Sequence, residues 1–251
     1  MRILIFDTET SGLDAGLHVM LQLSYQIVES ANFFTIKSVN HYFPWPWNPF
    51  RVSEEAIAVN GLTAEWLSQQ RLSSRKSALQ EFVADMATCG LVVAHNLQFD
   101  QGFLIAACME EGVAIGEWPD AYCTMVETTD FCGIPSDGFD DYKWPKLTEL
   151  AQCLGVDYDD IDLHDSMADV ELTKRCFQAL LRCGAYRFPE TERIRISLQS
   201  DAAGGVRFIV LDAKGNEMHP SCIPHLMPKT QWQAICNRLL VKWKAKKNGG
   251  E

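Results

Sequence analysis

Apolar residues recur along the chain at two spacings, one typical of strands and one typical of helices. Short apolar or alternating runs predict strands at residues 1–6, 19–28, 33–43, 91–94 and 122–124. Apolar residues three and four apart predict helices between Ser74 and Gly90, from Phe99 to Gly112, and over residues 147–154 and 166–183. The first three strands would form an antiparallel meander, and the later alternation of helices and strands predicts an α/β layer structure with a mixed sheet.

The pattern restarts beyond Pro189. Alternating apolar residues predict two strands, around 194–198 and 206–210, and a helix with an apolar stripe follows from Trp232 to Trp243. We interpret this stripe as core, with an interaction surface as the alternative. The expected organisation is a main domain at residues 1–189 and a small C-terminal α+β appendage, a hairpin plus a helix, at residues 190–251.

Composition indicates a soluble globular protein, with 47% hydrophobic and 22% charged residues in 251. No apolar run approaches the ~18 residues of a membrane span and no signal peptide opens the chain, so we expect a cytoplasmic protein. The nine cysteines form no CxxC pair, which argues against a disulfide framework or zinc ribbon. His219, Cys222 and His225 offer three zinc ligands without a fourth, so we interpret this segment as a loop.

Charge is unevenly distributed. The net formal charge is -11, but residues 1–189 hold 12 Lys+Arg and 27 Asp+Glu, whereas residues 190–251 hold 10 and 6. The acidic part would repel a polyanion unless bound cations offset some of its carboxylates. Four lysines near the end (Lys242, Lys244, Lys246 and Lys247) could contact phosphates or simply solubilise the terminus.

Three separated clusters carry the candidate chemistry: Asp7 and Glu9 in IFDTET, Asp100 in AHNLQFD, and His164 with Asp169 in LHDSMAD. Residues two apart on a strand point to one face, so Asp7 and Glu9 would share a side at the strand's carboxyl end, where α/β sheets bind ligands. Asp100 follows another predicted strand. Oxygen-only ligands favour hard cations such as Mg²⁺ or Mn²⁺.

Two such ions about 3.5–4 Å apart would hold the attacking and leaving oxygens of a phosphoryl displacement. His164 is the candidate base, because an imidazole with a pKa of about 6.5 accepts a proton from water at neutral pH. Residues five apart lie roughly 140° apart on a helix, so we expect His164 in the lead-in and Asp169 inside the helix. His95 would not share a face with the acids, and we interpret it as structural.

The three clusters, in this order, resemble the motifs of the DEDD exonucleases of the histidine branch (DEDDh), which includes the epsilon proofreading subunit of bacterial DNA polymerase III. The resemblance spans roughly residues 2–183, and AIAVNGLTAEWL is similar to the family's linking segment. It implies a ribonuclease-H-like fold. It also implies that Asp7 bridges two metals, that Glu9 and Asp169 bind the nucleophile-side metal, that Asp100 holds the other, and that His164 activates water.

The same resemblance implies which residues hold the terminal nucleotide. These are the backbone at Thr10 and the side chains of Leu13, Asn60 and Phe99. Asn60 stands where the family usually has histidine. Phe99 lies on the apolar face of its predicted helix, so it can belong to the core as well as stack on a base.

We therefore expect a 3′–5′ exonuclease that uses two Mg²⁺ (or Mn²⁺) ions to hydrolyse single-stranded DNA ends to 5′-mononucleotides, in DNA replication or repair. An exoribonuclease or oligoribonuclease is the close alternative, because exclusion of a 2′-hydroxyl depends on packing around the sugar. An alternative of another class is a non-catalytic accessory that docks a polymerase or holds a nucleic-acid end. The expected partners are a single-stranded 3′ end and, as a further candidate, a DNA polymerase, with no membrane.

Overall fold

The computed structural model describes residues 1–136, 141–161, 165–188, 195–200 and 206–211. The chain divides into two compact units, Met1–Tyr186 and Arg187–Glu251. Within the second unit, β6 (Arg195–Ser200) and β7 (Val206–Leu211) pair antiparallel, as the alternating apolar residues predict. The helix expected at 232–243, the three possible zinc ligands and the four terminal lysines lie outside the described residues.

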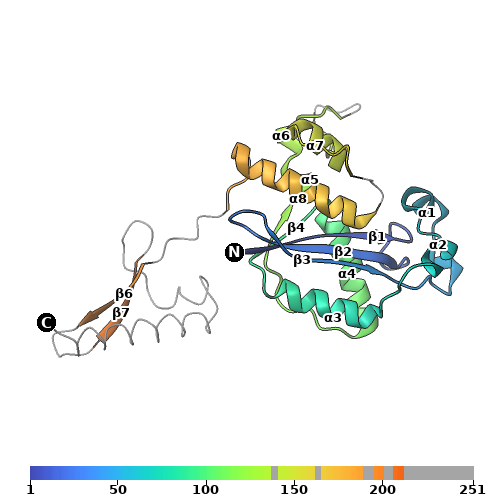
Figure 1. Ribbon diagram of the computed structural model, residues 1–251, viewed down its shortest axis with the longest axis horizontal. Coiled ribbons are helices and arrows are strands. Elements are labelled where there is room, and N and C mark those ends of the chain that lie inside the picture. Colours follow the sequence, from blue (N-terminus) through green and yellow to red (C-terminus); the bar gives the residue numbers. More distant parts are fainter. Residues whose placement is uncertain (137–140, 162–164, 189–194, 201–205, 212–251) are drawn as a thin grey trace. The chain divides into compact units, whose positions relative to one another are not determined.

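A five-stranded mixed sheet forms the centre of the first unit, in the order β3-β2-β1-β4-β5 (Figure 1). Its strands are β1 (Arg2–Thr10), β2 (Met20–Glu29), β3 (Thr35–Tyr42), β4 (Leu91–Ala94) and β5 (Asp120–Cys123). The first three strands form the predicted antiparallel meander, and β4 and β5 run parallel to β1. The mixed sheet predicted from the alternation of elements is therefore confirmed.

Helices cover both faces of this sheet. They are η1 (Pro49–Arg51, a 3₁₀ turn), α1 (Glu54–Asn60), α2 (Ala64–Ser68), α3 (Arg75–Met86), α4 (Leu97–Glu111), α5 (Thr124–Glu127), α6 (Thr129–Cys132), α7 (Leu147–Leu154) and α8 (Ser166–Cys183). Figure 1 shows α3 and α4 on one face and α8 with α7 on the other. Among the described residues, no helix combines the length and apolar character needed to cross a membrane.

Local signals explain the helix ends that the sequence predicted. Ser74 caps α3 by accepting a hydrogen bond from the Ser77 amide, and Asp165 caps α8 in the same way through the Met167 amide. Gly184 ends α8 in the left-handed conformation, which glycine adopts without a steric penalty. Capping and apolar periodicity therefore agree for these long helices.

Several strand boundaries differ from the prediction, for example those of β1 and β5. β1 does not stop at Asp7 but continues to Thr10, because its pairing with β2 extends to Met20. The strand expected at 122–124 begins earlier, at Asp120, and ends at Cys123. Thr124 already belongs to α5, and its hydroxyl lies 3.3 Å from the Ala94 carbonyl. Apolar runs locate strands but do not show where cross-strand pairing ends.

The alternation of β1 assigns its side chains to the two helical layers. Leu4 and Phe6 belong to the core beneath α3 and α4, where the Phe6 and Phe82 rings lie 5.3 Å apart. Asp7 and Glu9, at the odd positions, point to the opposite face and therefore lie under α8. The carboxyl end of β1 thus places its acids between the sheet and the first turn of α8.

Candidate active site

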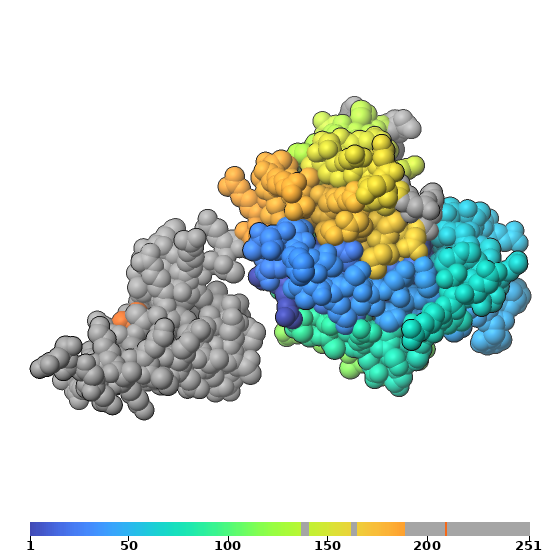
Figure 2. Space-filling view, viewed as in Figure 1, coloured from blue at the N-terminus to red at the C-terminus, as the bar shows by residue number. Residues whose placement is uncertain are grey.

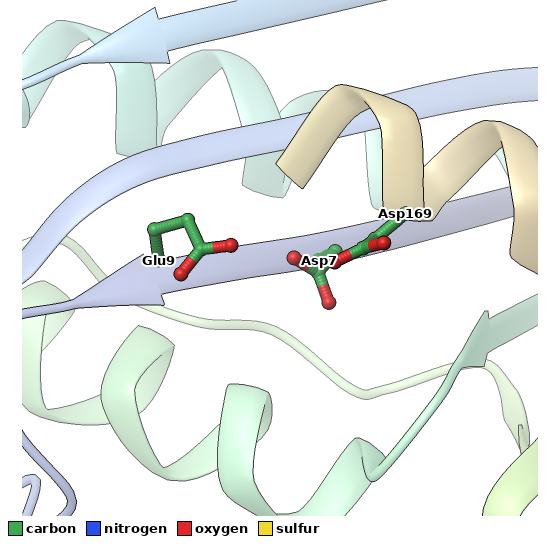
Figure 3. Close-up of side chains that lie close together, drawn as sticks. All are labelled: Asp7, Glu9 and Asp169. Atoms are coloured by element: carbon green, nitrogen blue, oxygen red, sulfur yellow. The ribbon is translucent and has the colours of Figure 1, made fainter. Parts of the chain in front are cut away.

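Three carboxylates converge where α8 crosses the end of β1 (Figure 3). Asp7 and Glu9 come from β1, and Asp169 comes from the first turn of α8. One oxygen of each lies within 4.8 Å of the others, and all three residues are half-buried. Asp169 lies inside the helix, as the five-residue spacing from His164 predicted. The structure thus brings together acids that are 160 residues apart in the chain.

Asp100 approaches β1 from the first turn of α4 and is buried. Its Oδ1 accepts hydrogen bonds from the Thr8 amide at 3.1 Å and the Thr8 hydroxyl at 2.7 Å. It does not belong to the three-carboxylate group, yet its charge raises the pKa of Asp7. Asp100 is therefore tied to the strand residue between Asp7 and Glu9 and lies close enough to act on the same charges.

Burial is the largest cause of high pKa values at this site. Burial, followed by the charges of Asp100 and Asp169, raises the pKa of Asp7 well above its ordinary value. Burial and Asp169 raise the pKa of Glu9 to about 8, although a hydrogen bond with Asn60 opposes the shift. Burial raises the pKa of Asp100 to about 7 against the hydrogen bonds from Thr8. Without a cation, these acids retain protons at a pH where isolated carboxyls are ionised.

This donor set fits hard divalent cations. Its ligand atoms are all carboxylate oxygens, the type that Mg²⁺ and Mn²⁺ prefer. A divalent ion would also take the place of the protons that burial and mutual repulsion hold on these carboxyls, because it neutralises several carboxylates at once. The protein side of a metal site is therefore present at Asp7, Glu9 and Asp169.

His164 lies outside the described residues, so its role as the base stays a prediction. His95 is described, and its ring nitrogens lie 3.0 Å from the Thr124 hydroxyl and 3.0 Å from the Pro145 carbonyl. Burial lowers the pKa of His95 to about 4, so the ring is neutral at neutral pH. Both nitrogens contact the protein, which supports the interpretation of His95 as a structural residue that links β4 to later segments.

Two of the residues expected to hold a nucleotide support the end of β1. The Asn60 side chain donates to the Thr10 carbonyl at 2.9 Å and accepts from the Leu62 amide at 3.1 Å. Thr10 is buried, and its hydroxyl donates to the Gly12 carbonyl at 2.6 Å. Asn60 therefore has a structural role beside Glu9, and its contact with a nucleotide stays a prediction.

The other two differ in exposure. Leu13 follows β1 and is 82% exposed, so its side chain is accessible to a ligand. Phe99 is half-buried, and its ring lies 4.9 Å from that of Phe103 on α4. One part of Phe99 thus packs in the protein while another part is accessible, and stacking on a base stays a prediction.

Sequence reasoning missed the polar residues that join α8 to the sheet. Asp165 caps α8 and also accepts hydrogen bonds from Gln22 and Tyr42. Its charge contributes to the raised pKa values of Asp7 and Glu9. The signal was the alternation of polar residues in LQLSYQ, in a strand whose other residues up to Val28 are apolar. Buried polar side chains on a strand mark a face that meets another polar element.

Solved structures of exonucleases have the same fold as this chain. The nuclease domain of 3′hExo, a DEDDh family member, bound to rAMP, has a TM-score of 0.55 at 17% identity, covering 75% of this chain and 96% of that one. E. coli exonuclease I in complex with a dT13 oligonucleotide has a TM-score of 0.54 at 16% identity, covering 84% of this chain and 52% of that one. The sheet and its helices thus have the ribonuclease-H-like fold of DEDD exonucleases, as expected.

The sequence itself matches the RNase T exonuclease family model over residues 4–177, and the chain belongs to this family. It is also 22% identical over 203 residues to ribonuclease T of Shigella boydii, covering 76% of this chain and 91% of that protein. The protein is accordingly a phosphodiester hydrolase of the exonuclease class. The particular resemblance to the epsilon proofreading subunit stays a prediction.

Proposed function

We propose that the protein removes nucleotides from the 3′ end of single-stranded DNA and releases 5′-mononucleotides in a metal-dependent reaction. One observation carries this proposal: Asp7, Glu9 and Asp169 converge to within 4.8 Å, beside the buried Asp100. Four acids on three elements, with pKa values raised by burial and mutual repulsion, suit the binding of cations.

Asp7, Glu9, Asp100 and Asp169 would hold two Mg²⁺ (or Mn²⁺) ions, and exonucleases of this family typically use divalent metals. When bound, such ions neutralise charge on the reacting phosphate and make water a stronger nucleophile at neutral pH. The four carboxylates would be ionised when they hold these ions. The Thr8 hydrogen bonds keep Asp100 in place during this change of charge.

His164 would take the proton of the attacking water, because a neutral imidazole is a suitable base near pH 7. The water oxygen forms a new bond to phosphorus, and the bond from phosphorus to the 3′ oxygen of the preceding nucleotide breaks. The 3′ oxygen stays on the shortened strand and takes up a proton from water to become a hydroxyl. The phosphate therefore stays on the 5′ position of the released nucleotide. Exposed Leu13, the Thr10 backbone, Asn60 and the accessible part of Phe99 would hold that nucleotide.

RNA is the second candidate substrate. The relative from Shigella boydii is named ribonuclease T, and the 3′hExo domain was solved with rAMP, whereas exonuclease I was solved with a DNA oligonucleotide. The choice depends on the space available to a 2′-hydroxyl beside the terminal sugar. Docking of a polymerase through residues 190–251 stays a separate prediction.

The test is digestion of matched DNA and RNA oligonucleotides that carry a 5′ label, with and without Mg²⁺. We expect a ladder that shortens from the 3′ end, release of 5′-mononucleotides, and faster cutting of DNA. Asp7→Ala should abolish the reaction, while Glu117→Gln, which changes an exposed acid outside the site, should not. Unchanged trimming by Asp7→Ala would refute the proposal, and faster cutting of RNA would move it to the second candidate.

A further inference from the structure

Two rows of side chains run across the sheet from the acid pair to its edge. Strand register aligns Glu9 on β1 with Gln22 on β2, and Gln22 with Tyr42 on β3. The neighbouring row, two residues along, aligns Asp7 with Ser24 and then Asn40. Because residues paired across strands share a face, all six lie on the side covered by α8.

Asn40 joins the two rows through hydrogen bonds. Its Oδ1 accepts from Gln22 Nε2 at 3.0 Å and from the Ser24 hydroxyl at 3.0 Å. Its Nδ2 lies 3.2 Å from the Tyr42 hydroxyl oxygen, which accepts. Gln22 and Ser24 are fully buried, so these contacts also fix the orientation of the Gln22 amide.

The rows hold the beginning of α8 at Asp165 and Ser166. Asp165 Oδ2 accepts from the Tyr42 hydroxyl at 2.7 Å and from Gln22 Nε2 at 2.9 Å. The Ser166 amide donates a hydrogen bond to Gln22 Oε1 at 3.4 Å, and the Ser166 hydroxyl donates a hydrogen bond to the Ser24 hydroxyl. In Figure 2 the surface of α8 lies directly against that of β2 and β3.

The second oxygen of Asp165 distinguishes this helix start from the others. Ser53, Thr63 and Ser74 cap their helices with a single hydroxyl. Asp165 caps α8 with Oδ1, which accepts from the Met167 amide at 2.9 Å, and has Oδ2 left for the sheet. Capping alone needs one oxygen, so the second one has the separate effect of tying the helix to β2 and β3.

Asp169 lies one turn after this anchor. Its backbone amide donates to the Asp165 carbonyl at 3.1 Å, so the position of Asp165 sets that of Asp169. We propose that Asp165, held by Tyr42 and Gln22, is a positioning residue that keeps the Asp169 carboxylate within reach of Asp7 and Glu9. This inference rests on the proposed function, because it concerns how the same acids are assembled to bind metal.

Two substitutions separate positioning from simple stability. Tyr42→Phe keeps the ring, which packs 5.2 Å from the Trp66 ring, and removes the hydrogen bond to Asp165 together with the one from Asn40. Asp165→Ser keeps a good capping side chain but cannot reach both Met167 and the sheet. We expect kcat to fall about 3- to 10-fold in Tyr42→Phe and about 10- to 100-fold in Asp165→Ser, with KM for the oligonucleotide unchanged.

Mg²⁺ titration by calorimetry supplies a readout other than activity. Both variants should bind Mg²⁺ more weakly than the unchanged protein. Because Tyr42 acts through Asp165, adding Tyr42→Phe to Asp165→Ser should cause little further loss. Such non-additivity is the signature of two residues that act as one unit.

Tyr25→Phe is the matched control. The Tyr25 hydroxyl donates to Asp85 Oδ2 at 2.6 Å, a similar Tyr–Asp bond between β2 and α3 on the other face of the sheet. This variant should lose stability without losing kcat or Mg²⁺ affinity.

The inference is overturned if Tyr42→Phe and Asp165→Ser behave like the control, losing stability alone. If the unchanged protein neither binds Mg²⁺ nor cuts oligonucleotides, the proposed function itself has failed. If it does both while the two variants remain unaffected, only the positioning role is wrong.

Discussion

The two faces of β1 and β2 are both covered by helices, yet opposite kinds of side chain occupy them. Toward α3 and α4 the strands present Leu4, Phe6, Leu23 and Tyr25. Toward the first turn of α8 they present Asp7, Glu9, Gln22 and Ser24. Side chains alternate between the two faces of a strand, so one sheet can have two functions. Its apolar face supplies stability, and its polar face brings the acids together at a cost in stability.

The neutral and the acidic side chains of the polar face also differ in how they are stabilised. Its neutral side chains, Gln22 and Ser24, are satisfied by hydrogen bonds to Asn40 and to the start of α8. The pKa of Asp7, by contrast, is raised by burial and by the charges of four neighbouring acids. The stability of this face therefore depends on protons or on cations.

The largest expected effect comes from the polar face. Asp169→Asn keeps the size of the side chain but removes a charge from the carboxylate group, so we expect kcat to fall by about 1000-fold. The metal-free protein should become more stable, because one source of repulsion on Asp7 and Glu9 is gone. Single-turnover hydrolysis and thermal unfolding in EDTA measure the two effects. If Asp169→Asn lost stability as well as activity, the acids would not be a source of instability in the metal-free protein.

A substitution on the apolar face should have the opposite effects, a loss of stability with catalysis retained. Phe82 is fully buried, and its ring lies 5.3 Å from Phe6 and 5.2 Å from Tyr25. Phe82→Ala should lower the free energy of unfolding by about 3–5 kcal/mol through lost burial and a cavity. Urea unfolding measures this, and kcat per folded molecule at low temperature should stay near that of the unchanged protein. A selective loss of catalysis would show that the two faces are not independent.

The pH dependence of stability should reveal the raised pKa values. The pKa of Glu9 is about 8 in the folded protein and 4.5 ordinarily, so between these values the folded state holds a proton that the unfolded state has released. Stability without metal should therefore fall as pH rises toward 8. His95, with a pKa of about 4, has the opposite effect below its ordinary 6.5, so the window from pH 6.5 to 8 isolates the acids.

Thermal unfolding in EDTA at pH 6.5 and pH 8 tests this expectation. The midpoint should be lower at pH 8, Mg²⁺ should remove the difference, and Glu9→Gln should reduce it. A midpoint that rises with pH in EDTA over this window would mean that the acids are already ionised in the folded protein.

The smallest effect on stability is expected at Leu13. Its side chain is 82% exposed, so Leu13→Ala should change the free energy of unfolding by no more than about 0.5 kcal/mol. If Leu13 holds the terminal nucleotide, KM should rise several-fold while kcat changes little. Steady-state kinetics on one oligonucleotide decides this, and an unchanged KM would remove Leu13 from the nucleotide site.

Much of the fold was predictable because its long elements carry repeated local signals. The stretch from Ser166 to Cys183 has five turns of helical spacing between a capping aspartate and a terminal glycine, and the observed helix has those bounds. The short helices α1, α2, α5 and α6 were not predicted. With one or two turns each, they have too few positions for a period to show.

The candidate site also has a part that could be predicted from the sequence and a part that could not. That Asp7 and Glu9 share a face follows from strand alternation, which is a local property of the sequence. Asp169 joins these two acids because α8 covers their face of the sheet, whereas Asp100, on α4, accepts a hydrogen bond from Thr8. Which helix covers which face is decided by tertiary packing. The link from Tyr42 to Asp165 likewise joins residues 123 positions apart.

By itself, the sequence determined the periodic elements, the ends of α8, and the order and type of the acidic clusters. Only the tertiary structure decided which acids meet and which polar residues hold them there. The physical reason is range: backbone geometry sets side-chain direction within a few residues, whereas strand register and helix docking result from packing between segments distant in the chain.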